Sequence, residues 1–235
     1  MPVGIIINVT SVILGGLVGS IVGSRLSEDL KQKMNWIFGV CALGMGISSV
    51  VLMQNMPAVV FSVIAGTLFG LTLKLGAAIE KVSGKVLTLF LSNADKAKAD
   101  LLLTAVVLFC ASGTGIYGSL DSGMTGNHSV LIAKSVLDFF TALIFACQLG
   151  KTVSLIGIPQ FAVMIGLFLL AKVIVPMTST SMIQDFKACG GFLLLATGFR
   201  MMQLRAFPVA DMIPAMVLVM PVSYVWSQWL LPLIS

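Results

Sequence analysis

The sequence predicts an all-α, polytopic membrane protein. Hydrophobic residues make up 58% of the 235 residues, whereas charged residues make up only 10%. The apolar residues also fall into blocks of membrane-spanning length, since a helix needs roughly 20 apolar residues to cross a bilayer. Composition and block length together favour several transmembrane helices in one chain.

Eight spans can be placed along the chain. The first covers residues 3–24, and the uncharged run 34–73 is long enough for two spans. The polar stretch 54–57, which ends in a proline, divides that run. The other five predicted spans are 101–117, 129–149, 152–171, 188–201 and 212–234.

The lysines and arginines predict the orientation, because cytoplasmic loops carry an excess of them. With the N-terminus outside, eleven of the 14 fall in the predicted cytoplasmic segments 25–33, 74–100, 150–151 and 200–205. Of the others, Lys134 lies within a span, and Lys172 and Lys187 lie near the outer side. We therefore expect both termini outside.

Regularly spaced glycines predict close helix contacts. Gly15, Gly19 and Gly23 follow one another at four-residue spacing in the first span, and Gly66 and Gly70 repeat the pattern in the third. Small residues at this spacing let membrane helices approach closely. The contacts are expected either within one chain or in a homodimer.

A faint internal repeat is visible at a shift of 152 positions. The shift places Gly39 over Gly191 and Gly46 over Gly198, and spans one to three then resemble spans six to eight. Five spans separate equivalent helices, and because five is odd the two copies must have opposite orientations in the bilayer. Inverted repeats of this kind are typical of secondary transporters, which bind substrate near the midplane.

This repeat divides the chain into four parts. Residues 1–79 form the first membrane repeat and residues 151–235 the second. Residues 101–150 hold two central spans, and residues 80–100 form a cytoplasmic linker. The linker mixes charged and apolar residues, which fits either an interfacial amphipathic helix or a solvated connection.

The connection between the two central spans, residues 111–129, is rich in glycine, serine and threonine. Glycine lets a backbone leave the helical conformation, and hydroxyl groups can bond to the freed backbone or to an ion. We expect a pore or binding site here, with Thr114, Asp121 and Asn127 as candidate residues. Asn127 is also expected to cap the span that begins at residue 129.

Two opposite charges stand within the fifth span. Lys134, Asp138 and Thr141 share one helix face, and about 1.5 Å per residue places Asp138 roughly 16 Å from the helix start, near the midplane. Charges at this depth are costly and usually functional. The pair either binds an ion or substrate, or clips helices together at a desolvation cost of several kcal/mol per ion; the first is favoured.

Two amides add to the candidate site. Asn8 in the first span and Gln160 in the sixth overlie each other at the same 152-residue shift. Both could therefore face the interface between the repeats.

Other classes of site have little support. One histidine and four cysteines in different spans do not form a metal site. The glycines from Gly113 to Gly118 match a dinucleotide fingerprint but lack the strand that it requires, so no cofactor is expected. No catalytic motif is present, which argues against an enzyme. The net charge of +5 fits cytoplasmic loops that face anionic lipid and gives no reason to expect nucleic acid.

Three segments resemble a known family: GIIINVTSVILGGLVGSIVG, LSEDLKQKMNWIFGVCALGMGI and IYGSLDSGMTGNHSVLIAKSVLDFFTALIFACQLG. The chain is similar to the YqgA-like family of bacterial cytoplasmic-membrane proteins of unknown function. The resemblance covers nearly the full length and is most specific at residues 118–138. It implies a bacterial inner-membrane protein that is a transporter candidate without an assigned substrate.

The sequence therefore predicts a secondary-type transporter of a small solute or ion, with the lipid bilayer as its surroundings. Two alternatives remain: a scaffold or regulatory membrane protein, and a passive channel. If the protein is a scaffold or regulatory protein, replacing Lys134 and Asp138 together by apolar residues should cause little loss of function.

Overall fold

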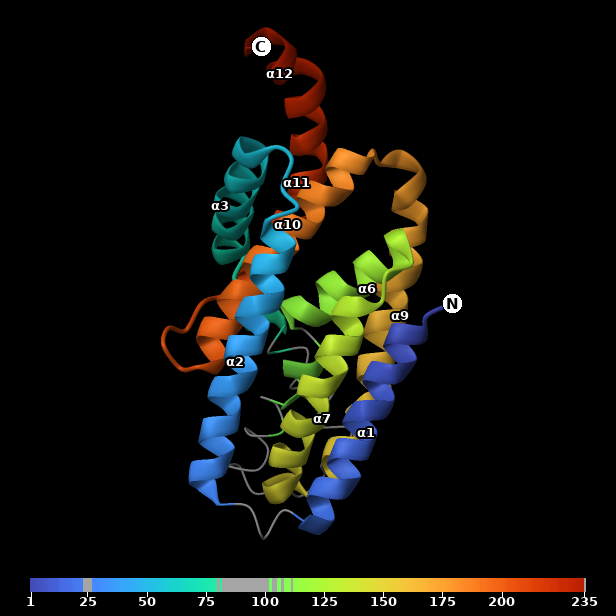
Figure 1. The fold of residues 1–235 in the computed structure, drawn as a ribbon, viewed down its shortest axis with the longest axis vertical. Helices are drawn as coiled ribbons and strands as arrows, with labels where there is room; N and C mark the ends of the chain where they lie inside the picture. The colour runs from blue at the N-terminus through green and yellow to red at the C-terminus, as the bar shows by residue number, and fades with distance from the viewer. Residues whose placement is uncertain are drawn as a thin grey trace. The chain divides into compact units, whose positions relative to one another are not determined.

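The computed structural model describes residues 1–22, 27–79, 81, 102, 105–106, 108–110 and 112–234, and all regular structure within them is helical (Figure 1). The chain divides into two compact units. The first contains Met1–Trp36 and Ala77–Lys172, and the second contains Ile37–Gly76 and Val173–Ser235. Apart from Lys81, the predicted linker at 80–100 lies outside the described residues.

The described residues include four helical segments that are long and apolar enough to cross a membrane: Val3–Val22, Ser129–Leu149, Thr152–Met177 and Val209–Leu233. A shorter apolar helix, α3, covers Met56–Thr72. Large apolar side chains face outward, among them Ile21 and Val217, which are 77% and 74% exposed. An apolar exterior of this kind suits lipid rather than water.

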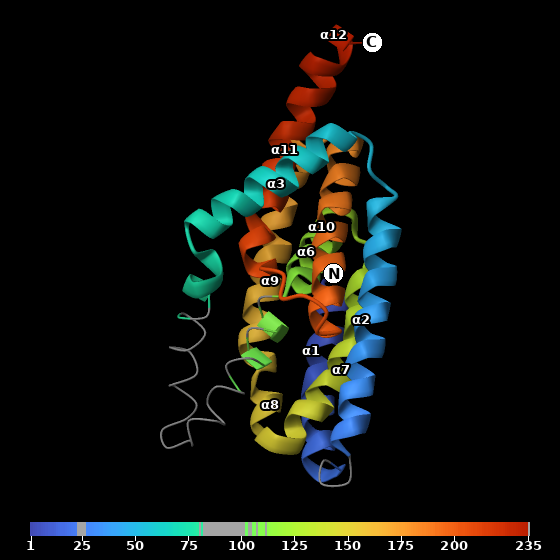
Figure 2. The same ribbon diagram turned by 90° about the vertical axis from the view of Figure 1, so that its left-hand side faces the viewer.

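Helices α1 (Val3–Val22) and α7 (Ser129–Leu149) lie side by side in the first unit, as Figure 1 and Figure 2 both show. An added Cβ at Gly15 would lie 3.1 Å from the Ala142 Cβ, and one at Gly19 would lie 2.7 Å from the Leu143 Cα. Both glycines are therefore needed for the close approach. The predicted role of Gly15 and Gly19 in helix contact is confirmed, and the contact lies within one chain.

Helix α6 covers Gly113–Thr125, so the prediction that the glycine-rich connection leaves the helical conformation is wrong for these residues. Ser112 caps the helix by accepting a 3.1 Å hydrogen bond from the Gly115 N–H. Gly126, with φ of 72°, ends it in the left-handed region that glycine adopts most easily. The predicted span at 101–117 is also wrong at its end, because the cap at Ser112 starts a new helix.

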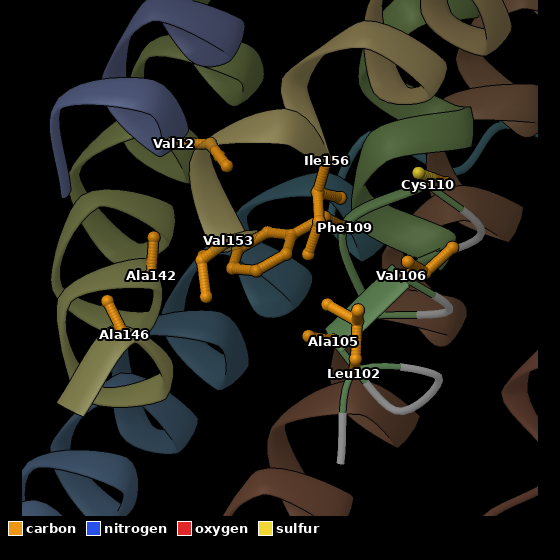
Figure 3. Close-up of a cluster of buried hydrophobic side chains, with 10 residues drawn as sticks. All are labelled: Val12, Leu102, Ala105, Val106, Phe109, Cys110, Ala142, Ala146, Val153 and Ile156. Atoms are coloured by element: carbon orange, nitrogen blue, oxygen red, sulfur yellow. The ribbon is translucent and has the colours of Figure 1, made fainter. Parts of the chain in front are cut away.

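A buried apolar cluster fills the interior of the first unit (Figure 3). Its members come from α1, α7, the described residues of 102–110, α8 (Thr152–Leu155) and the turn that follows: Val12, Leu102, Ala105, Val106, Phe109, Cys110, Ala142, Ala146, Val153 and Ile156. Figure 3 shows the Phe109 ring reaching toward Val153. This cluster excludes water from the side of α7 that it covers.

The second unit contains the C-terminal part of α2 (Glu28–Val50), α3, and the helices after residue 173. These are η2 (Val175–Met177), α10 (Thr180–Met201), η3 (Val209–Met212), α11 (Ile213–Val225), the π-helical turn η4 (Trp226–Leu230) and α12 (Leu231–Ile234). Helix α3 packs on α11, where Gly66 lies against Ala215, and on η3, where Gly70 lies against Asp211. These glycines, too, serve contacts within one chain.

Helix α10 begins eight residues before the predicted span at 188–201, which is therefore wrong at its start. Ser179 caps the helix, since its hydroxyl accepts a 3.3 Å hydrogen bond from the Met182 N–H. The added turns bring Asp185 and Lys187 into the helix. A carboxylate that looked extramembrane is consequently part of a packed helix.

Helices α2 and α10 cross at two glycine pairs. An added Cβ at Gly39 would lie 2.8 Å from the Gly198 carbonyl oxygen, and one at Gly46 would lie 2.9 Å from that of Gly191. The residue number falls on α10 as it rises on α2. The two helices therefore run antiparallel where they cross.

Candidate functional site

Helix α7 places Lys134 and Asp138 one turn apart on a buried face. The Lys134 ammonium donates to Asp138 Oδ2, and the two side chains are only 4% and 10% exposed. The two side chains are neighbours because residues four apart on a helix lie on the same face. An ion pair is thus enclosed about two turns into a helix that is long and apolar enough to cross a membrane.

Two amides from other helices complete the cluster around Asp138. The Asn8 Nδ2 on α1 donates to Asp138 Oδ2 at 2.9 Å. On α9 (Gly157–Ile174), Gln160 Nε2 donates to Asn8 Oδ1 at 2.8 Å and lies 3.5 Å from Asp138 Oδ2. Asn8 and Gln160 are fully buried. Three helices therefore converge on a single carboxylate oxygen.

Among the described residues, the cluster lacks a partner for one buried acceptor. The Gln160 Oε1 is buried and has no hydrogen-bond partner among the described residues, although an unpaired buried acceptor costs about 1–3 kcal/mol. All the donors that the described residues offer to Asp138 converge on Oδ2. The site thus retains acceptor capacity beside a negative charge.

On the Lys134 side, the pair is next to an aromatic ring and a glycine. The Lys134 Nζ lies 5.9 Å from the centre of the Phe109 ring, within the range of a cation–π contact. On the α6 side, a Cβ added at Gly115 would lie 3.2 Å from the Lys134 Cε. Low polarity strengthens each electrostatic contact and raises the cost of an unpaired charge.

The structure brings together four of the eight predicted site residues, namely Asn8, Lys134, Asp138 and Gln160. Thr141 on α7 and Thr114 on α6 are buried, but neither bonds to the pair within the described part of the chain. Asp121 is buried on α6, where its carboxylate accepts a 3.1 Å hydrogen bond from the Thr125 hydroxyl.

Asn127 is exposed and lies at the start of α7. Its Oδ1 accepts hydrogen bonds from the Ser129 N–H at 2.9 Å and from the Ser129 hydroxyl at 2.7 Å. The predicted capping role fits this geometry, although the cap position itself is His128.

Asp185 in the second unit is a buried carboxylate that the sequence prediction missed. Its Oδ1 accepts from the N–H groups of Gln54 and Asn55, at 2.8 and 2.9 Å. Its Oδ2 accepts from Asn55 Nδ2 at 2.8 Å and from the Ser223 hydroxyl at 2.6 Å. Asp185 and Ser223 are fully buried.

Two sequence signals could have found Asp185. A helix start leaves backbone N–H groups that need acceptors, and α3 begins directly after Gln54 and Asn55. Ser179 is a typical N-cap residue and predicts a helix start that carries Asp185 into the bundle. The carboxylate therefore serves as the acceptor for the segment that enters α3.

Within the described residues, no group of three or more His, Cys, Asp or Glu side chains could hold a metal ion. The four cysteines are free thiols and form no disulfide bonds. The cluster around Asp138, which consists of Asn8, Lys134, Asp138 and Gln160, can hold or exchange a positive charge at Asp138.

Comparison with known proteins places the chain in a family. Residues 3–224 match the model of a family described as "Protein of unknown function (DUF554)". The uncharacterized protein YqgA of Escherichia coli (strain K12) is 44% identical over 97% of this chain and 99% of its own. The uncharacterized membrane protein YdfK of Bacillus subtilis (strain 168) is 23% identical over 92% of this chain and 93% of its own.

No solved structure matches the chain. The family match covers nearly the whole chain, and it agrees with the resemblance in the three sequence segments. The apolar helices, and the membrane protein among these relatives, indicate that the chain is a helical membrane protein. It belongs to the DUF554 family, whose function is unknown.

Proposed function

We propose that this protein is a secondary-type transporter that moves a small solute or ion across a bacterial cytoplasmic membrane through a site at Asp138. The observation that carries the proposal is the buried Asp138–Lys134 pair, to which two other helices contribute amides. Ionisable residues inside a membrane commonly mark ion pathways or proton relays. The proposal includes no catalytic conversion and no cofactor.

Helix directions agree with the order of the first, fifth and sixth spans in the proposed eight-span arrangement. Helices α1 and α7 run parallel, since Gly4 contacts Leu131 while Gly19 contacts Leu143. Helix α9 runs antiparallel to α1, because Asn8 bonds to Gln160 while Ile13 contacts Gly157. These directions are those of the first, fifth and sixth spans in the proposed topology.

Helix bounds and contacts also support an inverted repeat. Adding 152 to the bounds of α2 gives 180–202, and α10 covers Thr180–Met201. The same shift carries α3 to 208–224, where η3 and α11 cover residues 209–225. A similar match relates α1 to α9.

The glycine crossing has the reciprocity that a two-fold axis requires. Gly39 meets Gly198, the equivalent of Gly46, and Gly46 meets Gly191, the equivalent of Gly39. The crossing is antiparallel, which fits copies of opposite orientation. The hydrogen bond between Asn8 and Gln160 joins two further equivalent positions.

A purely structural pair would explain the cluster less well. Replacing a buried ion pair by packed apolar residues is often neutral or stabilising. A pair that only held helices together would therefore add little stability by being charged. The buried Gln160 Oε1, which has no partner among the described residues, adds a further cost beside the pair. A site that admits a ligand during its cycle accounts for both features.

The test is flux in proteoliposomes that contain the purified protein and a trapped pH-sensitive dye. Inward gradients of NaCl, KCl, methylammonium chloride and sodium lactate are imposed in turn. We expect at least one gradient to drive a pH change in the wild-type vesicles, and we expect D138N to lose at least 90% of its rate.

D29N is the matched control, because Asp29 pairs with Lys33 at the same four-residue spacing but is 71% exposed. Its vesicles should keep the wild-type rate. No flux with any gradient would favour the scaffold, and flux that persists in D138N without driving uphill movement would favour the channel.

A further inference from the structure

Two amides at equivalent positions of the proposed repeat, Asn8 on α1 and Gln160 on α9, are bonded unequally to the same carboxylate oxygen. The Asn8 Nδ2 lies 2.9 Å from Asp138 Oδ2, whereas Gln160 Nε2 lies 3.5 Å from it. Gln160 Nε2 donates instead to Asn8 Oδ1 at 2.8 Å. The hydrogen bonds therefore run in one direction, from Gln160 to Asn8 and from Asn8 to Asp138.

The direction of these bonds follows from the charge on Asp138. A carboxylate only accepts hydrogen bonds, so the amide next to it must present its NH₂ group, and its carbonyl oxygen is then left for the second amide. The second amide donates in turn, and its own carbonyl oxygen receives no donor. This oxygen is Gln160 Oε1, which is buried without a partner among the described residues.

The same two amides can form a second arrangement with the same number of hydrogen bonds. In that arrangement Gln160 Nε2 donates to Asp138 Oδ2, Asn8 Nδ2 donates to Gln160 Oε1, and Asn8 Oδ1 becomes the oxygen without a donor. Gln160 Nε2 already lies close to the position that it would occupy. The exchange needs rotations of two side chains, while the Lys134–Asp138 pair keeps its bond and its charges throughout.

Two apolar clusters cover the polar residues on the two sides along α7. The Leu131 cluster consists of Ile5, Val9, Leu131, Met164 and Phe168. The cluster of Figure 3, here called the Phe109 cluster, contains Ala142 and Ala146 beyond Asp138. Leu131 precedes Asp138 by seven residues and Ala146 follows it by eight, and these two side chains are 0% and 2% exposed. Both sides of the polar residues are therefore closed by apolar packing.

Helices α1 and α9 contribute to both clusters, and they run antiparallel. Helix α1 provides Val9 to the Leu131 cluster and Val12 to the Phe109 cluster, and α9 provides Met164 to the Leu131 cluster. Because the two helices are antiparallel, exchanging the roles of equivalent residues on them also exchanges the two directions along α7. Alternating access requires two states that are related in this way.

We propose that the Asn8–Gln160 pair is a two-position switch, in which a change of the amide that holds Asp138 changes which apolar cluster opens. The inference rests on the proposed function, because it assigns to these residues the change of access that a transporter needs. The structure contains the first position, in which Asn8 holds Asp138. The Gln160 oxygen without a described partner is the acceptor that the second position uses.

The test is the rate at which a thiol reagent labels single cysteines on the two sides of Asp138. L131C reports on the Leu131 cluster and A146C on the Phe109 cluster, each in a protein whose four native cysteines are replaced by alanine. N-ethylmaleimide is the probe, since it crosses the membrane of a vesicle and reaches both sides. The measured quantity is the ratio of the two labelling rates.

Two variants hold the switch in opposite positions. Q160M leaves Asn8 as the amide donor to Asp138, whereas N8L, which replaces asparagine by a side chain of similar shape, leaves Gln160 as that donor. Because both positions have the same number of hydrogen bonds, the wild-type protein should populate both. We expect the ratio to shift at least roughly threefold in one direction in Q160M and by a similar factor in the other direction in N8L.

S135A is the control, because the buried Ser135 hydroxyl on α7 donates to the Leu131 carbonyl of its own helix. This variant should keep the wild-type ratio. Gel filtration checks that each variant is folded, and N8A replaces N8L if that variant fails the check. Failure of both to fold would overturn the inference, because the second position requires that Gln160 can hold Asp138 without Asn8.

Shifts of the ratio in the same direction in Q160M and N8L, or no shift in either variant, would also overturn the switch. The labelling does not depend on transport, so it separates the two proposals. Flux in vesicles without opposite shifts would refute the switch and leave the transporter proposal intact. Opposite shifts without flux under any gradient would leave the switch and refute the transporter.

Discussion

The two units each bury a carboxylate on a helix, but they satisfy it differently. Asp185 accepts from four neutral donors of the described residues, two at each oxygen. Asp138 receives a charged donor and two amides at a single oxygen, beside an amide oxygen without a described partner. A complete donor set suits a fixed structure, whereas an incomplete set suits a ligand site.

The difference separates two roles. Asp185 fixes the backbone that leads into α3 and ties it to Ser223 on α11, so its carboxylate has no reason to change partners. Asp138 is held by side chains of α1, α7 and α9. Side chains can change partners at much lower cost than backbone groups can.

Breaking the ion pair should have the largest effect on stability. K134M leaves Asp138 charged and buried without its cation, which typically costs 3–5 kcal/mol, so we expect the free energy of unfolding to fall by about that amount. Denaturant titration in detergent and choline buffer measures it. K33M, at an exposed pair, should cost less than about 1 kcal/mol. An equal and small loss in both variants would contradict the buried-pair account.

Removing the second carboxylate should have the next largest effect. D185A leaves two backbone N–H groups, an amide and a hydroxyl without their acceptor, and we expect a loss of about 3 kcal/mol. Hydrogen exchange should localise the loss to Gln54 and Asn55. Unchanged protection of these amides would show that Asp185 does not hold this segment.

A single donor of the complete set should matter less. S223A removes one hydroxyl donor to Asp185, and we expect a loss of about 1–2 kcal/mol by the same titration. S135A is the control, because the Ser135 hydroxyl donates to the Leu131 carbonyl of its own helix. If S135A were the more destabilising variant, the contribution of Ser223 to the carboxylate would be negligible.

The smallest effect is expected at Gln160. Q160M removes one hydrogen bond to Asn8 but also removes a buried acceptor that has no partner among the described residues. The two changes oppose each other, so the free energy of unfolding should change by less than about 1 kcal/mol. A loss above about 2 kcal/mol would mean that Gln160 is structural in the same sense as Asp185.

The sequence predicted the pairing of Lys134 with Asp138 because the geometry of this pair is local. Helical spacing alone puts Lys134 next to Asp138. The 152-residue shift paired Asn8 with Gln160, and these two side chains bond to each other. The spacing of Gly15 and Gly19 likewise predicted a contact that the structure contains.

The cluster around Asp185 was missed for two reasons. Its contacts with Gln54, Asn55 and Ser223 are distant in sequence, and the start of α10 was predicted eight residues too late. Residues 172–187 looked like an outer loop, since they contain charges and a proline. The cap at Ser179 outweighs that composition and extends α10 around Asp185. At α6 the error was the reverse. The glycine content predicted a non-helical connection, but the Ser112 cap and the tertiary packing keep the backbone helical.

The most direct test of the difference between the two carboxylates is to compare D138N and D185N in the same vesicle assay, with each rate divided by the amount of folded protein. We predict that D138N abolishes flux whereas D185N lowers stability but keeps most of the flux per folded molecule. S223A replaces D185N if that variant does not fold. Equal rates for D138N and wild type, or loss of flux only when the Asp185 cluster is altered, would contradict the account.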